Sequence, residues 1–291
     1  MAITAKEVAA LREITGAGMM DCKRALVEAD GDMEAAKDIL RQRGQAKGAK
    51  REGKATGEGT LVVAAKPDAS QAVVLELNCE TDFVGRSDTF RALAQSLADQ
   101  ALAGDLTDGS QIVADDAIAD ATSRLGEKIR IGHLLNWKAE GAGAVAVYLH
   151  TATGRVAVPV EIGLDAPAGD KLPAVIEIAR ELGMQAAALK PVCLSREDVP
   201  AHLVAHEREV LRSLPDMASK PPQIQDKMID GRMGKFYQEI CLLEQIYARD
   251  NTKSVTQYVK EAAKTAGLNL TVKRFERLEV GRAAAEAEGE D

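Results

Sequence analysis

The spacing of apolar residues changes near residue 60, and this change limits what the chain can fold into. Over residues 1–44 the apolar side chains recur three or four positions apart, as they do in helices buried along one face. After the change, short apolar runs are separated by turn residues, which is typical of β-strands. The sequence therefore predicts a helical N-terminal unit followed by a mixed α+β part.

Residues 1–44 contain start and stop signals for three short helices. Thr4 and Glu7 have the spacing of a capping box, and Asp32 is placed to cap the third helix. Glycines are expected to end the three helices, namely Gly16, Gly31 and Gly44. Such short helices cannot bury their apolar stripes singly. We therefore expect one three-helix domain over residues 1–44.

Residues 45–59 are rich in Lys, Gly and Ala, and we expect them to form a basic, flexible linker. The segment 48–55 is close to a phosphate-binding loop. It has Ala55 where that motif needs Ser or Thr, and a helix precedes it where the motif needs a strand. An RNA-associated adaptor that uses the lysines of 47–54 is an alternative function. The formal net charge of -8 weakens it, because nucleic-acid binders usually carry a basic excess.

The remainder reads as two related α+β halves, each with a strand hairpin, helices and a closing strand. The first core subdomain spans 60–140 and the second 141–280. Their closing segments match at four positions, each 141 residues apart: Gly126, Ile129, Ile131 and Leu134 with Gly267, Leu270, Val272 and Phe275. Helices are expected at 87–102, 115–125, 171–182, 185–189 and 254–266. Strands are expected at 61–65, 73–79, 129–137, 145–149 and 155–162, with a closing strand after Gly267 that runs through Val280. The fold class is α+β, with antiparallel sheets.

Two further segments lie outside this duplicated plan. Residues 202–214 and 223–247 read as the two helices of an antiparallel hairpin, inserted at about 200–250. Four apolar residues on each helix are expected to face one another: Leu203, Val210, Leu211 and Leu214 with Ile224, Met228, Ile240 and Leu243. The hairpin has little else to pack on, which favours an arm for a partner. The acidic tail, 281–291, is expected to be disordered.

Composition excludes several classes of protein. The four cysteines lie far apart with no C-x-x-C pair, which argues against a zinc ribbon or a disulfide scaffold and fits a reducing compartment. The N-terminus lacks the apolar stretch of a signal peptide, and no apolar run is long enough to span a membrane. We therefore expect a cytoplasmic protein.

Signals for catalysis are weak. His202 and His206 are four apart, but the Glu that follows the first His of a zinc protease motif is replaced by Leu203. A cysteine hydrolase that uses Cys79 is a second alternative function, although no nucleophile signature surrounds this residue. We expect no chemical catalysis, no cofactor and no metal.

The segment Thr81–Val84 is the most informative loop. Only 3% of the residues are aromatic, yet Phe83 stands in a short polar loop between a strand and an amphipathic helix capped by Ser87. In one interpretation Phe83 folds back as a lid on that helix. In the other, a rigid loop presents Phe83 as an anchor for a pocket of a partner.

Two segments, Leu11–Leu26 (LREITGAGMMDCKRAL) and Asn78–Arg86 (NCETDFVGR), resemble bacterial elongation factor Ts, a translation factor. The order of domains agrees with this family over nearly the whole chain. The resemblance implies an N-terminal domain of the ubiquitin-associated type, two core subdomains, an inserted helical hairpin and a short C-terminal module that returns to the GTP-binding domain of the partner. It implies a guanine nucleotide exchange factor for elongation factor Tu, in its GDP-bound and nucleotide-free forms.

The resemblance also assigns roles to residues. Thr81, Asp82, Phe83 and Val84 match the family motif that inserts beside the nucleotide of Tu and dislodges its magnesium ion, so that GDP leaves and GTP rebinds. The N-terminal domain is expected to dock on the GTP-binding domain of Tu through Leu11, Arg12, Thr15, Gly16, Ala17, Gly18, Met19 and Met20. The second subdomain is expected to hold another Tu domain, and the hairpin to mediate a homodimer. Neither membrane nor direct nucleic-acid binding is expected.

Overall fold

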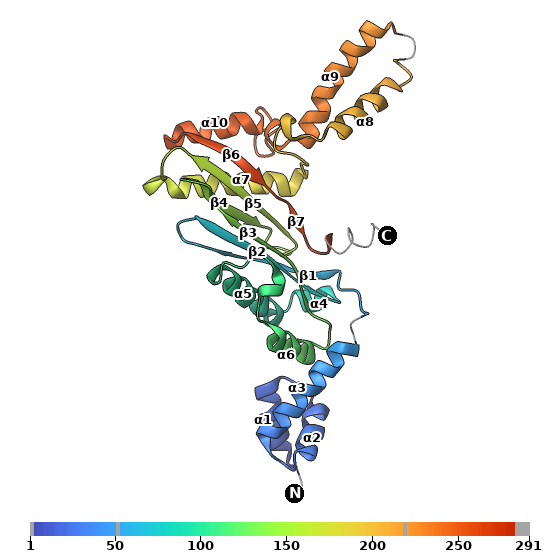
Figure 1. Cartoon of the computed structure of the whole chain (residues 1–291), viewed down its shortest axis with the longest axis vertical. Helices are drawn as coiled ribbons and strands as arrows, with labels where there is room; N and C mark the ends of the chain where they lie inside the picture. Colours follow the sequence, from blue (N-terminus) through green and yellow to red (C-terminus); the bar gives the residue numbers. More distant parts are fainter. Residues whose placement is uncertain (1–2, 51–52, 218–219, 283–291) are drawn as a thin grey trace.

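The computed structural model describes residues 3–50, 53–217 and 220–282, and for residues 44–50 it describes the backbone alone. The molecule is elongated, with a small helical bundle at one end, a core of sheets and helices, and a projecting helical hairpin at the other end (Figure 1). This arrangement agrees with the expected α+β class.

The N-terminal bundle consists of α1 (Ala5–Thr15), α2 (Met19–Glu28) and α3 (Met33–Lys50). The capping box of Thr4 and Glu7 is confirmed, as is the left-handed cap at Gly16. Each helix contributes to one small aliphatic core, which includes Leu11, Leu26 and Ala36. Packed together, the three helices thus bury apolar side chains that each short helix would leave exposed by itself.

The expected end of the third helix at Gly44 is wrong, because α3 continues to Lys50. The first six residues of the expected linker are therefore helical. A glycine inside a helix costs only about 1 kcal/mol, and the following residues, Gln45, Ala46 and Lys47 among them, are good helix formers. Because α3 runs through 48–50, a helix leads into this segment where a phosphate-binding loop needs a strand.

The first core subdomain contains an antiparallel sheet in the order β1 (Glu58–Ala65), β2 (Gln71–Cys79) and β3 (Arg130–Lys138). Helices α5 (Asp88–Ala103) and α6 (Asp115–Leu125) cover one face of it, with a 3-10 turn at Gly109–Gln111. Every residue of β2 is buried, because this central strand is covered on both faces. The short apolar runs that predicted these strands reflect their burial in the sheet.

The second subdomain repeats the plan. Its antiparallel sheet has the order β4 (Ala144–Leu149), β5 (Val156–Leu164) and β6 (Leu270–Phe275), and the short β7 (Leu278–Glu279) also pairs with β5. Helices α7 (Leu172–Leu189) and α10 (Val255–Ala266) cover one face, and short 3-10 turns lie at Gly169–Lys171, Arg196–Asp198 and Leu242–Glu244. Gly126 and Gly267 both end a helix in left-handed conformation ahead of the closing strand, as the 141-residue match indicates.

The two sheets pack against each other through their remaining faces. Leu61 and Val74 of the first sheet meet Ala157 of the second, and Trp137 packs near Val145. The core therefore has four layers, helices–sheet–sheet–helices (Figure 1). Along β2 and β5, alternate residues face either the helices or the other sheet.

The helical hairpin is formed by α8 (Ala201–Arg212) and α9 (Pro222–Ile240), which project from the second subdomain (Figure 1). Leu211, Ile229, Met233 and Met217 form its small core. Three of the eight residues expected to face one another across the hairpin do not: Val210 and Ile224 are exposed, and Leu243 packs on the core of the second subdomain. Leu243 lies beyond Ile240, where α9 ends.

Two expected helix boundaries in the second half are wrong. The helices expected at 171–182 and 185–189 are a single helix, α7, because Gly183 lets the helix approach β4 and β5: an added Cβ would lie 2.7 Å from the Cβ of Tyr148. The helix expected to reach residue 247 ends at Ile240, because Cys241 is extended and pairs with Cys193. The tail segment 283–291 lies outside the described residues.

The bundle packs against the core through α3 and α6. Arg124 of α6 donates a hydrogen bond to the carbonyl of Ile14 (3.2 Å) and covers Gly16, and Arg41 forms an ion pair with Asp116. Within the described ranges, no helix is both long and apolar enough to cross a membrane.

Candidate functional site

The segment Thr81–Val84 forms a one-turn helix, α4 (Asp82–Gly85), and not the loop that the sequence suggests. Thr81 is extended and accepts a hydrogen bond from the backbone N–H of Val84 (3.5 Å), so it caps this turn. A backbone bond from Gly85 N–H to the carbonyl of Thr81 (3.2 Å) closes it. The motif is thus an ordered turn between β2 and α5 (Figure 1).

Phe83 and Val84 have opposite environments. Phe83 is 83% exposed, whereas Val84 packs against the core of the first subdomain. The interpretation of Phe83 as a lid on the following helix is therefore wrong: the phenylalanine buried on α5 is Phe90. Asp82 forms an ion pair with Arg86 (2.9 Å), and both side chains are largely in solvent. Of the motif, the aromatic ring alone projects as an apolar group.

Backbone contacts seat α4 on the sheet. Gly85 is buried against Gly59 of β1, and an added Cβ at Gly85 would lie 3.0 Å from the carbonyl oxygen of Gly59. On the other side, the carboxylate of Glu127 accepts hydrogen bonds from the backbone N–H groups of Glu80 (3.0 Å) and Thr81 (2.9 Å). The turn that carries Phe83 is therefore held from both flanks.

Cys79 ends β2 beneath this turn and is fully buried. Its thiol donates to the carbonyl of Thr81 (3.1 Å). Burial, together with the nearby carboxylate of Glu127, raises the pKa of Cys79 to about 12. A thiol that stays protonated at neutral pH is a poor nucleophile, so this environment disfavours the cysteine-hydrolase alternative.

The N-terminal residues that the resemblance singles out fall into three groups. Met19, Met20 and Arg12 are exposed at the junction of α1 and α2. Leu11 and Ala17 are buried in the bundle core, and Gly16 faces Arg124. Thr15 donates to the carbonyl of Leu11 (2.7 Å) and Gly18 precedes α2, so they shape the turn between the helices.

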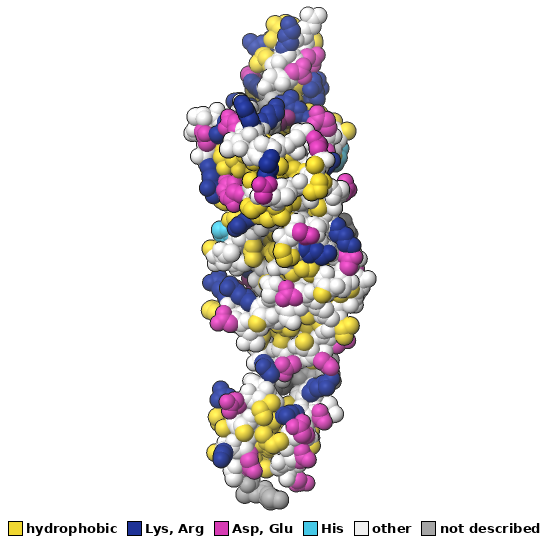
Figure 2. Space-filling model, turned by 90° about the vertical axis from the view of Figure 1, so that its left-hand side faces the viewer, with side chains coloured by type: hydrophobic (Ala, Val, Ile, Leu, Met, Phe, Trp, Pro, Cys, Tyr) yellow, Lys and Arg dark blue, Asp and Glu magenta, His cyan; other side chains and the backbone are white. Residues whose placement is uncertain are grey.

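Val27 is an exposed residue that sequence reasoning missed. It lies seven positions after Met20, on the same face of α2, and both are more than half exposed. The sequence contains a signal for this exposure, because Met20 and Val27 are apolar yet lie outside the face of α2 that buries Cys22 and Leu26. Figure 2, which views the bundle from the left-hand side of Figure 1, also shows apolar side chains on it, bordered by charged ones. The side chains of Met20 and Val27 are accessible without a rearrangement of the bundle core.

His202 and His206 are exposed on α8. Among the residues that the structure describes, no group of three or more His, Cys, Asp or Glu side chains is arranged to hold a metal ion. Side chains of the basic segment 47–50 are not described, so the RNA-adaptor alternative gains no support.

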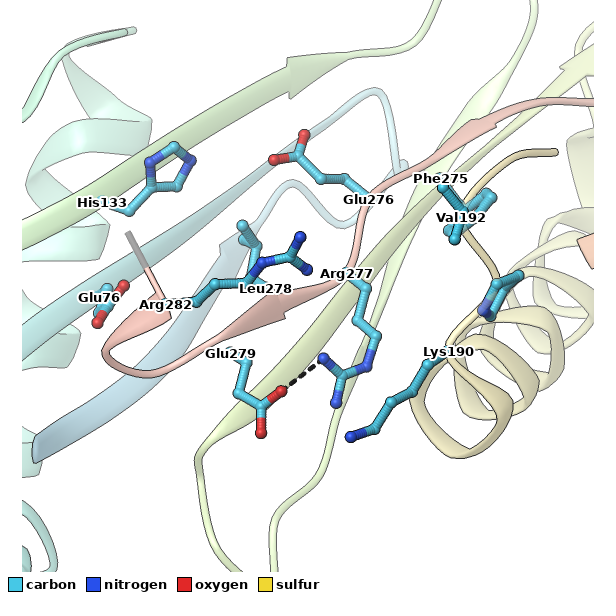
Figure 3. Close-up of a pocket in the computed structure, with 11 residues that line it drawn as sticks. Glu76, His133, Lys190, Val192, Phe275, Glu276, Arg277, Leu278, Glu279 and Arg282 are labelled. Atoms are coloured by element: carbon cyan, nitrogen blue, oxygen red, sulfur yellow. Dashed lines mark hydrogen bonds and ion pairs between the residues drawn. The ribbon is translucent and has the colours of Figure 1, made fainter. Parts of the chain in front are cut away.

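A cavity of about 620 Å³ lies where the two subdomains meet (Figure 3). His133 and Glu76 line it from the first sheet, and Arg277 and Glu279 from the segment around β7, where they form an ion pair of 2.7 Å. Nε2 of His133 is buried without a hydrogen-bond partner. Acidic and basic side chains alternate around the cavity, so it has no single sign of charge that would select a ligand.

The candidate site is therefore an ordered turn that presents one aromatic side chain, Phe83, to solvent. The fold and the site define an α+β protein with an exposed aromatic side chain on a turn held at both ends.

Comparison with known proteins agrees with this class. The family model described as "Elongation factor TS" matches residues 80–282. Elongation factor Ts of Nitratidesulfovibrio vulgaris (strain DP4) is 42% identical, over 99% of this chain and 99% of its own. Those of Symbiobacterium thermophilum and Clostridium botulinum (strain Alaska E43) are 41% and 40% identical, over 96% and 98% of this chain and 92% and 95% of their own. The chain belongs to the elongation factor Ts family of translation elongation factors.

Proposed function

We propose that this protein is a guanine nucleotide exchange factor for elongation factor Tu. It binds Tu–GDP, promotes release of GDP and leaves a nucleotide-free complex to which GTP rebinds. The observation that carries this proposal is the exposure of Phe83 on a turn that is seated on the core sheet. Family membership supplies the partner.

In the proposed mechanism, the exchange factor displaces the groups of Tu that bind GDP. GDP is held by backbone amides around its phosphates and by a magnesium ion that neutralises them. Phe83 inserts beside this site, with Thr81, Asp82 and Val84 forming the turn that supports it. A displacement of about 1 Å weakens several charge-assisted bonds together and dislodges the magnesium ion. No proton transfer, covalent step, cofactor or metal of this chain is required.

Exchange also needs an interface that is broad. Ts and GDP lower each other's affinity for Tu by the same factor, so the ternary state must be held by several weak contacts. We assign one contact to the exposed residues of the N-terminal bundle, Arg12, Met19, Met20 and Val27. The second subdomain holds another domain of Tu, and the exposed face of the hairpin supports a homodimer. We place the protein in the cytoplasm, where it contacts neither membrane nor nucleic acid.

Co-purification of the full chain with Tu tests this proposal. We expect a stable complex in the absence of nucleotide and its dissociation when GDP and magnesium are added in excess, because binding is reciprocal. A complex that forms equally well with and without GDP would contradict nucleotide exchange. Failure to form any complex would contradict the choice of partner.

A further inference from the structure

Glu127 connects two segments that are far apart in the sequence. It follows Gly126, where the left-handed cap ends α6, and it precedes β3. One of its carboxylate oxygens accepts the backbone N–H groups of Glu80 (3.0 Å) and Thr81 (2.9 Å). The other accepts the hydroxyl of Thr81 (2.5 Å). All three bonds end on the two residues that immediately precede α4.

The connection runs in both directions. The backbone N–H of Lys128 donates to the carboxylate of Glu80 (2.7 Å), while Glu127 receives the N–H of Glu80. Hydrogen bonds to an ionised carboxylate are roughly twice as strong as neutral ones. The two segments therefore hold each other across the end of the sheet.

The turn depends on this anchor for its orientation. A helix of four residues has no stability of its own, so its direction is set by what holds its ends. The C-terminal end rests against Gly59 through Gly85, and the N-terminal end is held by Glu127 through Thr81. Phe83, which is 83% exposed, contributes little to holding the turn in place.

We propose that Glu127 is a positioning residue for nucleotide exchange: it fixes the start of α4 and thereby aims Phe83 at the partner. This inference rests on the proposed function of Phe83. Glu127 bonds the two residues that precede the turn and acts through Thr81. Its loss leaves the aromatic ring in place on the chain but lets the turn change direction.

Release of a fluorescent GDP analogue from Tu, measured at saturating exchange factor, tests this role. We expect Glu127→Ala to lower the maximal rate about tenfold, because an anchor displaced by about 1 Å has effects of this size or more. Affinity for nucleotide-free Tu is expected to change less than about twofold, since the outer contacts remain. Glu127→Gln keeps a carbonyl oxygen for the two N–H groups and is expected to restore most of the rate.

Asp198→Ala is a matched control. Asp198 accepts the N–H (3.0 Å) and hydroxyl (2.7 Å) of Ser195, which is the same kind of bond, but it lies in the second subdomain beside the hairpin. We expect this variant to keep the maximal rate of the unchanged protein. Equal losses in both variants would indicate a general loss of folding and would overturn the positioning role.

A double-mutant cycle separates this inference from the proposed function. If Glu127 acts through Phe83, then Glu127→Ala has no further effect on a Phe83→Ala protein. Independent, multiplying losses would overturn the inference, and so would a normal rate for Glu127→Ala. A normal rate for Phe83→Ala alone would instead contradict the proposed function.

Discussion

Phe83 and Val84 are neighbours in the sequence, yet one projects into solvent and the other packs into the core. The cause is local: Thr81 caps a single turn, and Gly85 is buried against Gly59. Val84 then faces inward, where it contacts the aliphatic core, and Phe83 faces outward. The sequence alone left Phe83 open between lid and anchor, because its orientation depends on contacts with residues far away in the chain.

A substitution at Gly85 tests how closely α4 packs against β1. We expect Gly85→Ala to lower the free energy of unfolding by about 1–3 kcal/mol, because the added Cβ meets the backbone of Gly59 and cannot be relieved by a side-chain rotation. It should also slow GDP release by moving α4. Urea denaturation and the exchange assay measure the two effects.

Gly231→Ala is the control for that substitution. Gly231 lies inside α9 with open space where a Cβ would be, so alanine should stabilise the protein by about 0.5–1 kcal/mol. If Gly85→Ala is as stable as the unchanged protein and exchanges at the same rate, the seat of α4 is not as tight as described.

At the scale of elements, local signals predicted where most helices and strands lie. Caps at Thr4, Ser87 and Ser254 each begin a helix, and the glycines at 16, 126 and 267 each end one. The end of α3 was missed for a local reason, the helix propensity of the residues after Gly44, but other errors arise where a distant contact decides the outcome. Gly183 lies where the sequence suggests a break between two helices, but α7 continues through it and packs closely on the sheet there.

Glu127 shows the same limit for the site. Its partners are 46 and 47 positions away, so no local pattern identifies it. The pairing of strands does: Asn78 pairs with Arg130 and Leu77 with Ile131. Continuing this register beyond the strand ends places Glu127 opposite Thr81. Prediction of Glu127 therefore requires the pairing of β2 with β3. The sequence predicts both strands but does not show that they are neighbours in the sheet.

At the scale of the whole molecule, one side-chain cluster ties the two sheets together. Glu161 of β5 is buried and accepts hydrogen bonds from Arg274 (2.6 Å) and from the N–H of Glu140 (2.8 Å). The guanidinium of Arg274 lies 4.0 Å from the ring centre of Trp137, which belongs to the first sheet. This cluster adds a polar contact to the apolar ones of Leu61, Val74 and Ala157 that hold the two subdomains together.

We expect Arg274→Met to lower the free energy of unfolding by about 2 kcal/mol, because it leaves the buried Glu161 carboxylate with fewer partners and removes a cation–π contact. Arg274 is partly exposed, which keeps the effect moderate. Trp137 is the single tryptophan of the sequence, so its fluorescence should change as well. Lys273→Met, on the exposed neighbouring residue, is expected to alter neither quantity.

The separate parts of the molecule agree with binding at several places at once: a bundle with exposed apolar residues, a core with a projecting ring, and an arm (Figure 1). The low aromatic content, 3%, matters at this scale too. The core is built mainly from aliphatic side chains, with Phe90 fully buried in the first subdomain, whereas Phe83 lies largely in solvent.

The rate at which Phe83→Ala releases a fluorescent GDP analogue from Tu tests the central claim most directly. Phe83 is largely in solvent, so its loss should leave the free energy of unfolding unchanged and slow GDP release at least about tenfold, as expected for a buried anchor of an interface. Val113→Ala, at another exposed apolar residue of the same subdomain, should release GDP at the normal rate. A normal rate for Phe83→Ala would contradict the account.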